Sequence, residues 1–241
     1  MIAGVISLLD YPEAIYLWRV HKFDFCVWMC AFLGTTLLGV EIGLAISVAV
    51  SLLLIIYESA FPHTAVLGRL PGSNVYRNIK QYPNAERYDG IVIVRIDAPI
   101  YFANTDNIRT KLTKYQKAAE EELAARDSGE VKYVLIELSP VSHVDSSALH
   151  ILHDMIESYN ERGIQMLFSN PSVSVMDSFE RGKIVDAVGR EHIFVSTHDA
   201  VKWSLDHMDA IAVSVHVPIE SIEEGVSDKD LEGDDGKDFE A

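Results

Sequence analysis

The hydrophobic and polar positions of this 241-residue chain divide it into two regions. From Phe25 to Tyr57 the sequence runs FCVWMCAFLGTTLLGVEIGLAISVAVSLLLIIY, and Glu41 is the only charged residue in it. Beyond Pro62, short β-branched runs alternate with amphipathic segments, which is typical of a folded domain in water. The pattern therefore predicts a membrane segment followed by a soluble domain.

The length of the apolar run predicts two membrane helices. Its thirty-three residues would extend about 50 Å as one helix, against a hydrocarbon core of about 30 Å. Basic residues occur on both sides of the run, which favours a hairpin with both ends in the cytosol. We therefore expect residues 1–62 to be the end of a transmembrane domain, with spans over about 25–40 and 41–57.

Gly39, Glu41 and Gly43 are predicted to form the turn of this hairpin. At the turn, the Glu41 charge is hydrated near the opposite membrane surface, whereas in mid-membrane it would cost roughly 2.5 kcal/mol or more. Gly39 and Gly43 also make a GxxxG pattern, which can bring two helices close together. We favour the simpler interpretation, in which both glycines break helices at the turn.

The region after the apolar run predicts an α/β domain. Residues 63–90 are interpreted as a linker and the start of the domain, and the domain as a whole is expected over 71–210. A strand is predicted at 91–96, with residues 101–103 extending it, and Asn104 or Thr105 is expected to cap the helix that follows. Further strands are predicted at 131–138, 164–169 and 192–195, each followed by a helix. This alternation is typical of a mostly parallel sheet covered by helices.

The charge of the chain is concentrated at its end. The formal net charge is −16, and residues 220–241 hold ten acidic residues and two lysines, a net charge of −8. We therefore expect residues 211–241 to be a disordered acidic tail, and we expect no nucleic-acid partner. Cys26 and Cys30 lie within the apolar run, so they indicate no disulfide framework, and a cytosolic soluble part is the simpler interpretation.

Residues 143–153, HVDSSALHILH, hold the candidate chemistry. The serines follow a buried strand, as in a nucleophile elbow, but the GxSxG glycines are missing. His150 and His153 lack the HExxH pattern of a metalloprotease. We therefore predict no catalytic residue, no metal site and no cofactor.

Instead, Asp145 is predicted to be a helix N-cap, which places Ser146 and Ser147 in the first turn, where free N–H groups favour an anion. Two interpretations stay open: the serines belong to a capped helix only, or one of them is phosphorylated.

Two long segments carry a family resemblance. Residues 67–104, LGRLPGSNVYRNIKQYPNAERYDGIVIVRIDAPIYFAN, and 134–152, VLIELSPVSHVDSSALHIL, together with the membrane run, resemble the C-terminal end of plant SulP sulfate permeases, closest to the vacuolar group. The resemblance implies that the soluble part is a STAS domain, a mixed, mostly parallel sheet with helices.

In that family the DSS turn is the site of phosphorylation and partner contact. The resemblance therefore implies that His143, Asp145, Ser146 and Ser147 contact partners and that Ser147, with Ser146 beside it, is the regulatory serine. Ala148 replaces the glycine that is common there.

The resemblance also implies a function. The chain is expected to be the C-terminal portion of a secondary active sulfate transporter, beginning near the third-last span, with a cytosolic STAS domain for stability, targeting or phospho-regulation. The alternative is a membrane-tethered STAS adaptor without transport activity. Expected partners are the remaining transmembrane helices of the transporter, a second copy in a homodimer, and a cytosolic regulatory protein or kinase at the DSS turn. The vacuolar membrane is the expected location, with the plastid or plasma membrane as alternatives.

Overall fold

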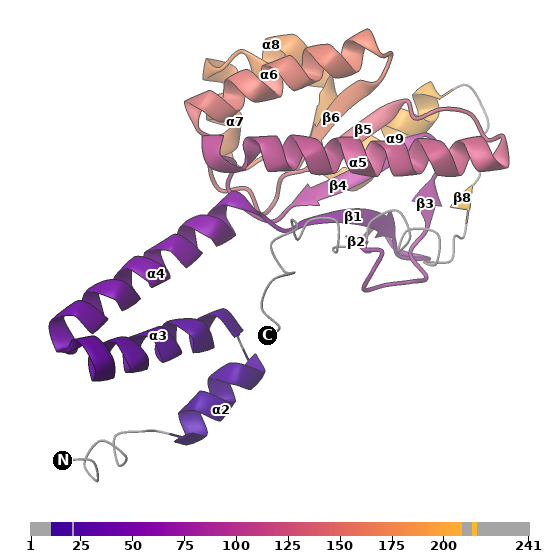
Figure 1. Ribbon diagram of the computed structural model, residues 1–241. Helices are drawn as coiled ribbons and strands as arrows, with labels where there is room; N and C mark the ends of the chain where they lie inside the picture. The colour runs from indigo at the N-terminus through magenta and orange to yellow at the C-terminus, as the bar shows by residue number, and fades with distance from the viewer. Residues whose placement is uncertain (1–10, 21, 209–213, 216–241) are drawn as a thin grey trace. The chain divides into compact units, whose positions relative to one another are not determined.

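The computed structural model describes residues 11–20, 22–208 and 214–215. The chain divides into two compact units between Phe61 and Pro62 (Figure 1). The predicted acidic tail, apart from Ser214 and Val215, lies outside the described residues.

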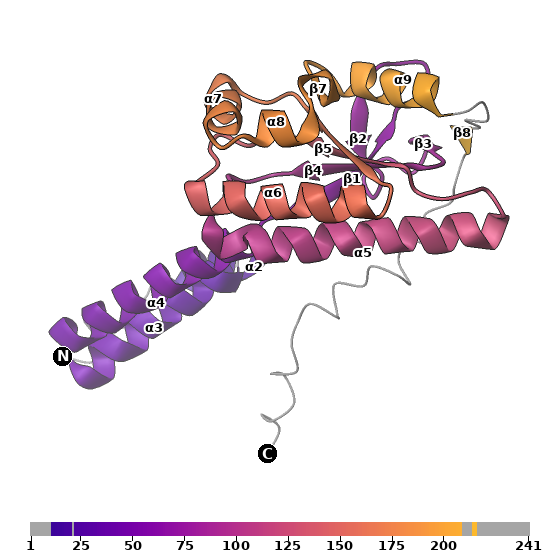
Figure 2. The same ribbon diagram turned by 90° about the horizontal axis from the view of Figure 1, so that it is seen from above.

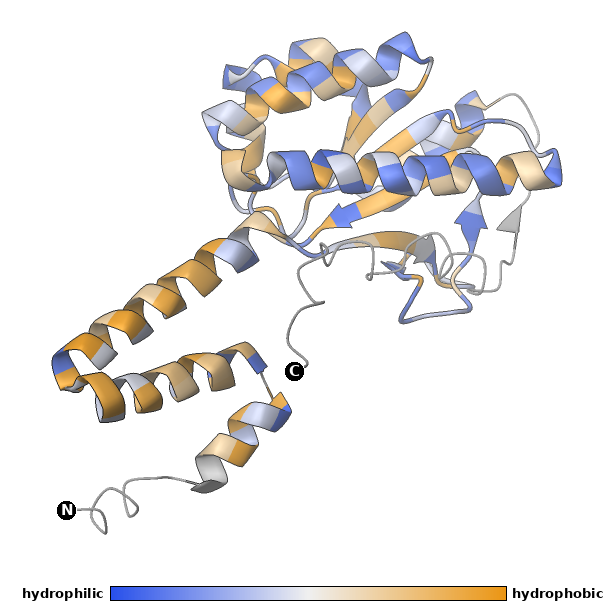
Figure 3. Cartoon of the chain, in the orientation of Figure 1, coloured by the Kyte–Doolittle hydropathy of each residue, from blue (hydrophilic) through white to orange (hydrophobic). Residues whose placement is uncertain are grey.

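Three helices lie in the described part of the N-terminal unit. They are α2 (Tyr11–Val20), α3 (Lys22–Leu38) and α4 (Val40–Ala60). The α3 and α4 helices lie side by side as a hairpin, and many of their exposed side chains are apolar (Figure 3). Of the described helices, α4 alone is long and apolar enough, by length and composition, to cross a membrane.

The hairpin turn differs in one respect from the prediction. Gly39 is the single residue between α3 and α4, with φ at +93°, and Glu41 lies in the first turn of α4. Gly43, however, lies inside α4, so the prediction that it breaks a helix is wrong. A Cβ atom at Gly43 would lie 2.2 Å from the Thr35 nitrogen and 2.4 Å from the Gly34 carbonyl carbon. Glycine is therefore needed here because the two helix backbones are in contact.

The C-terminal unit is built on a mixed sheet. Strands β4 to β7 run parallel to one another, and β1, β2, β3 and β8 pair antiparallel along one side. The order is β2-β1-β4-β5-β6-β7, with β3 paired to β4 and β8. The strands are β1 (Thr64–Arg69), β2 (Tyr76–Asn78), β3 (Arg87–Tyr88), β4 (Ile91–Ile96), β5 (Tyr133–Glu137), β6 (Gln165–Ser169), β7 (Ile193–Phe194) and β8 (Ser214–Val215).

Helices cover both faces of this sheet, with α5 and α6 on one side and α9 on the other (Figure 2). The helices are α5 (Phe102–Arg126), α6 (Ser146–Glu161), α7 (Val173–Arg181), α8 (Ile184–Val188) and α9 (Thr197–His207), with a 3-10 turn at Arg190–His192. In β4, Val92 and Val94 face the core under α5 to α8, whereas Ile91 and Ile93 face the core under α9. Two buried faces explain why the central strands are continuous apolar runs.

The segment before the parallel strands is part of the sheet. Residues 63–90, interpreted from sequence as a linker and domain start, supply β1, β2 and β3, and the first half of β1 pairs with β4 while its second half pairs with β2. Ala65 and Leu67 of β1 are buried in the core under α9. Short strands separated by Pro, Gly and Asn give little periodicity, which is why the pattern alone did not reveal them.

The start of α5 also differs from the prediction. Residues 101–103 do not extend β4, because α5 begins at Phe102 with Tyr101 as its N-cap residue. Asn104 is not the N-cap; its Oδ1 instead accepts a hydrogen bond from the Tyr101 nitrogen at 2.9 Å, from the third position of the helix. This reach-back bond is the amide counterpart of a capping box. It fixes Tyr101 and Phe102 at the carboxyl end of the sheet.

Candidate functional site: the turn before α6

The candidate turn lies where two loops meet at the carboxyl end of the parallel strands. Ile100, in the loop after β4, forms a parallel bridge with Val144, in the loop after β5. The Ile100 nitrogen donates to the His143 carbonyl at 3.0 Å, and the Asp145 nitrogen donates to the Ile100 carbonyl at 3.1 Å. Ile100 and Val144 are both buried. The backbone of the turn is therefore held in place against its neighbour.

Asp145 joins the starts of two helices. Its Oδ1 accepts a hydrogen bond from the Ala148 nitrogen at 2.7 Å, so it is the N-cap of α6, at the position where the sequence places a cap. Its Oδ2 accepts a second bond, at 2.9 Å, from the nitrogen of Phe102 at the start of α5. A carboxylate is favoured here because the N-termini of both helices carry partial positive charge.

The two serines are exposed at the first two positions of α6. The next residue, Ala148, is buried. The Ser146 and Ser147 side chains are therefore accessible while the helix below them is anchored in the core. This exposure is what a kinase or a protein partner needs.

Exposed aromatic residues accompany the predicted site. The His143 side chain is exposed, and its ring centroid lies 6.2 Å from that of Tyr101. Phe102, the next residue, leaves 68% of its surface exposed. The structure thus brings His143 and Asp145 together with Tyr101 and Phe102, which the sequence had not indicated. In the sequence, the only sign of this aromatic surface is the apolar pair Tyr101-Phe102 directly before a predicted helix.

The two other histidines of the stretch lie further along α6. His150 is exposed and His153 is half-buried. Within residues 11–20, 22–208 and 214–215, no group of three or more His, Cys, Asp or Glu side chains is arranged to hold a metal ion. The opposite face of α6 is apolar and buried, and it includes Leu152, Met155, Ile156 and Tyr159.

A charged cluster lies at the carboxyl end of β4. Arg95 donates to Asp97 through Nε at 2.5 Å, and His63 Nδ1 lies 2.8 Å from the second carboxylate oxygen. Burial raises the pKa of Asp97, but the hydrogen bonds from Arg95 and His63 outweigh burial, so the pKa falls below its ordinary value of 3.8. The cluster fixes the chain directly after Pro62 to the end of β4.

Comparison with known proteins gives the class of the C-terminal unit. The family model of the STAS domain matches residues 82–200, which include the parallel strands and the turn before α6. These residues are therefore a STAS domain, as the resemblance predicted. The solved structure of the anion transporter SLC26A9 is similar over 84% of this chain and 33% of its own, with a TM-score of 0.70 and 28% identity.

The most informative relatives are plant sulfate transporters. The chain is 49% identical to probable sulfate transporter 4.2 of Arabidopsis thaliana and 46% identical to its chloroplastic sulfate transporter 4.1. Both matches cover 87% of this chain and 31% of the relative. The chain is thus similar in sequence to these sulfate transporters, and it spans about a third of their length.

Proposed function

We propose that this chain works as part of a sulfate-transporting membrane protein, to which it contributes a helical hairpin and a cytosolic STAS domain. The observation that carries this proposal is the match to sulfate transporter 4.2, which extends over 210 residues. The STAS unit, residues 62–241, has 180 residues, so at least 30 of the matched residues (210 − 180) lie in the hairpin unit. The sequence similarity therefore extends over both units of the chain.

The chemistry of the hairpin supports a sulfate path outside it. A sulfate ion in a membrane needs N–H donors or cations, yet the only charged residue between Phe25 and Tyr57 is Glu41, which would repel it. We infer that further membrane helices hold the anion, and that the hairpin packs beside them. Sulfate uptake by liposomes containing only the 241-residue chain is expected to equal that of empty liposomes; saturable uptake would contradict this inference.

A chimera tests the transport role directly. The aligned part of sulfate transporter 4.2 is replaced by this chain, and sulfate uptake is measured in cells that lack their own sulfate uptake. We expect the chimera to accumulate sulfate against its concentration gradient, as a secondary active carrier does. A chimera that reaches the membrane at normal abundance but does not transport would favour the tethered-adaptor alternative.

The turn before α6 is proposed to regulate this transporter through phosphorylation or partner contact. A phosphate on Ser147 or Ser146 would add about −1.5 to −2 charge at an exposed helix N-terminus. The test compares Ser146→Ala, Ser147→Ala and Ser147→Asp in the chimera. We expect Ser147→Asp to differ from Ser147→Ala in flux or surface abundance, with Ser146→Ala as the matched neighbour. Identical values for all three variants would leave only the capping role.

The exposed aromatic pair supports the adaptor alternative at the same turn. Tyr101 and Phe102 offer an apolar contact beside His143 and the serines. If the turn binds a protein, Phe102→Ser should weaken capture of that partner, whereas the same change should leave transport by the chimera unchanged. A second copy of the chain is one such partner, and the oligomeric state of Phe102→Ser in detergent distinguishes it from a separate regulatory protein.

The vacuolar membrane is our proposed location, on the strength of the SulP resemblance. The plastid is the principal alternative, because one of the similar relatives is described as chloroplastic. A fluorescent fusion to the C-terminus of the chimera, viewed in plant cells with markers for both membranes, separates the two locations.

A further inference from the structure

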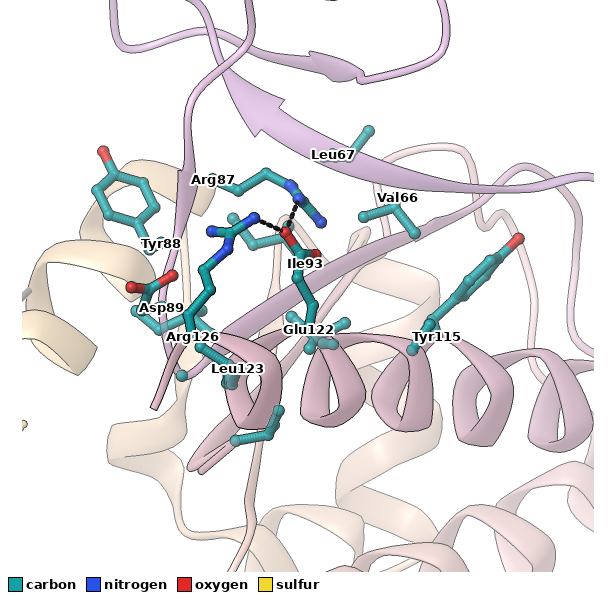
Figure 4. A pocket seen from close by; sticks show the side chains of 16 residues that line it. Val66, Leu67, Arg87, Tyr88, Asp89, Ile93, Tyr115, Glu122, Leu123 and Arg126 are labelled. Atoms are coloured by element: carbon teal, nitrogen blue, oxygen red, sulfur yellow. Dashed lines mark hydrogen bonds and ion pairs between the residues drawn. The ribbon is translucent and has the colours of Figure 1, made fainter. Parts of the chain in front are cut away.

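A cavity lies between α5 and the antiparallel side of the sheet (Figure 4). Its volume, counted as the space open to the centre of a water molecule, is about 70 Å³. The small residues Ala118 and Ala119 of α5 and Gly90 opposite them are part of its lining, and they leave side-chain volume unfilled. The apolar part of the wall includes Val66, Val92, Leu123 and Val131.

Four charged side chains line the same cavity. Arg87 donates to Glu122 Oε1 at 2.7 Å, and Arg126 donates to the same oxygen. All three side chains are partly exposed, and in Figure 4 the two guanidinium groups converge on the Glu122 carboxylate. Each guanidinium has five N–H donors, so one shared oxygen uses only a small part of their capacity. Asp89 is the fourth group; burial, more than the opposing effect of Arg126, raises its pKa, so its charged form is less stable than that of an exposed aspartate.

This combination suits one class of ligand. A bare inorganic anion would satisfy the arginines and leave the apolar wall uncovered, whereas an uncharged alkyl group would do the reverse. One arginine guanidinium can bind a carboxylate through two parallel N–H···O bonds. One water molecule needs about 10–15 Å³ of such space, so the cavity is large enough for roughly five to seven waters or a ligand of similar size.

We propose that this cavity binds a small aliphatic carboxylate of about four to five carbons, with its carboxylate on Arg87 and Arg126 in place of Glu122 and its chain against Val66, Val92 and Ala119. Glu122 then acts as an internal stand-in for the ligand when the site is empty. The proposal does not depend on transport, because all the residues belong to the STAS unit.

The experiment uses the full chain in lipid nanodiscs and measures dissociation constants by ligand-observed NMR. The probes are butanoate, acetate, which has the charge without the chain, and 1-butanol, which has the chain without the charge. We expect butanoate to bind at least tenfold more tightly than either. Equal binding of acetate and butanoate would indicate a simple surface anion site and overturn the proposal, as would the absence of butanoate binding at millimolar concentration.

Substitutions of residues that line the cavity are expected to change the affinity for butanoate in opposite directions. Arg87→Gln should weaken butanoate binding at least tenfold, whereas Glu122→Gln should strengthen it several-fold because the competing carboxylate is gone. Ala119→Leu fills the cavity and should abolish binding. Arg109→Gln, on an exposed part of the same helix, is the matched control and should change nothing. If Ala119→Leu fails to fold, the opposite effects of Arg87→Gln and Glu122→Gln still decide, and weaker binding by Glu122→Gln would overturn the proposal.

Discussion

Leu53 of α4 leaves 65% of its surface exposed, whereas Leu135 of β5 is 0% exposed. The same residue type thus has opposite surroundings in the two units. In the STAS unit, apolar side chains face inward from both sides of a sheet because burial removes them from water. In the hairpin they face outward, and a glycine contact holds the helices together. This arrangement is typical of helices in lipid, where apolar burial drives no association and close backbone packing does.

The largest effect that would test this comparison is expected in the STAS core. Phe168 is fully buried and packs edge-to-face on Phe179, with ring centroids 5.1 Å apart. Phe168→Ala should lower the free energy of unfolding of this unit by about 3–5 kcal/mol. Urea unfolding in detergent, followed by Trp203 fluorescence in a background without Trp18 and Trp28, measures the change. Val195→Ala, at a residue that is 89% exposed, is the control and should change stability by less than about 0.5 kcal/mol.

The stability of the hairpin should fall when side-chain volume is added at the contact between its helices. Gly43→Ile places a side chain where the backbone of α3 lies, so we expect a cost of about 1–3 kcal/mol to hairpin stability. Forced unfolding of single molecules in bicelles measures it. Leu44→Ile, at an exposed neighbour on α4, is the control. An unchanged hairpin in Gly43→Ile would mean that the close contact does not stabilise it.

A smaller effect is expected at the turn that joins α5 and α6. Asp145→Ala removes the hydrogen bonds to Ala148 and Phe102 and should cost about 0.5–2 kcal/mol. Ser196→Ala, which removes the single cap bond of α9, is the matched control and should cost less. Trp203 fluorescence measures both. If the two variants lose equal stability, the link to Phe102 adds nothing.

The smallest effect appears only as a dependence on pH. Because the pKa of Asp97 is lowered in the folded state from its ordinary value of 3.8, its contribution to stability is complete above that ordinary value and is lost as pH falls through the folded value. Asp97→Asn should therefore be less stable than the parent chain at pH 6, and the difference should shrink below pH 4. A stability difference that stays constant between pH 6 and pH 3 would exclude this ion pair as the cause.

Much of the fold follows from local patterns in the sequence. The apolar run, the strand over residues 91–96 and the helix that begins at Ser146 were predictable because hydrophobic periodicity reports burial directly. The cap at Asp145 was predictable for a related reason, since a cap bonds N–H groups only three residues away. The resemblance to sulfate permeases depended equally on contiguous residues.

The tertiary structure alone decided the contacts between distant residues. The bond from Phe102 to Asp145 joins residues 43 positions apart, and the bond from Arg87 to Glu122 joins residues 35 apart. The pairing of β1 with β4 and the Gly43 contact with Gly34 are likewise settled by packing. The sequence determined which side chains are apolar, charged or suited to cap a helix. Which of them meet is determined by chain topology, because a residue's pattern with its neighbours carries no information about a partner on another element.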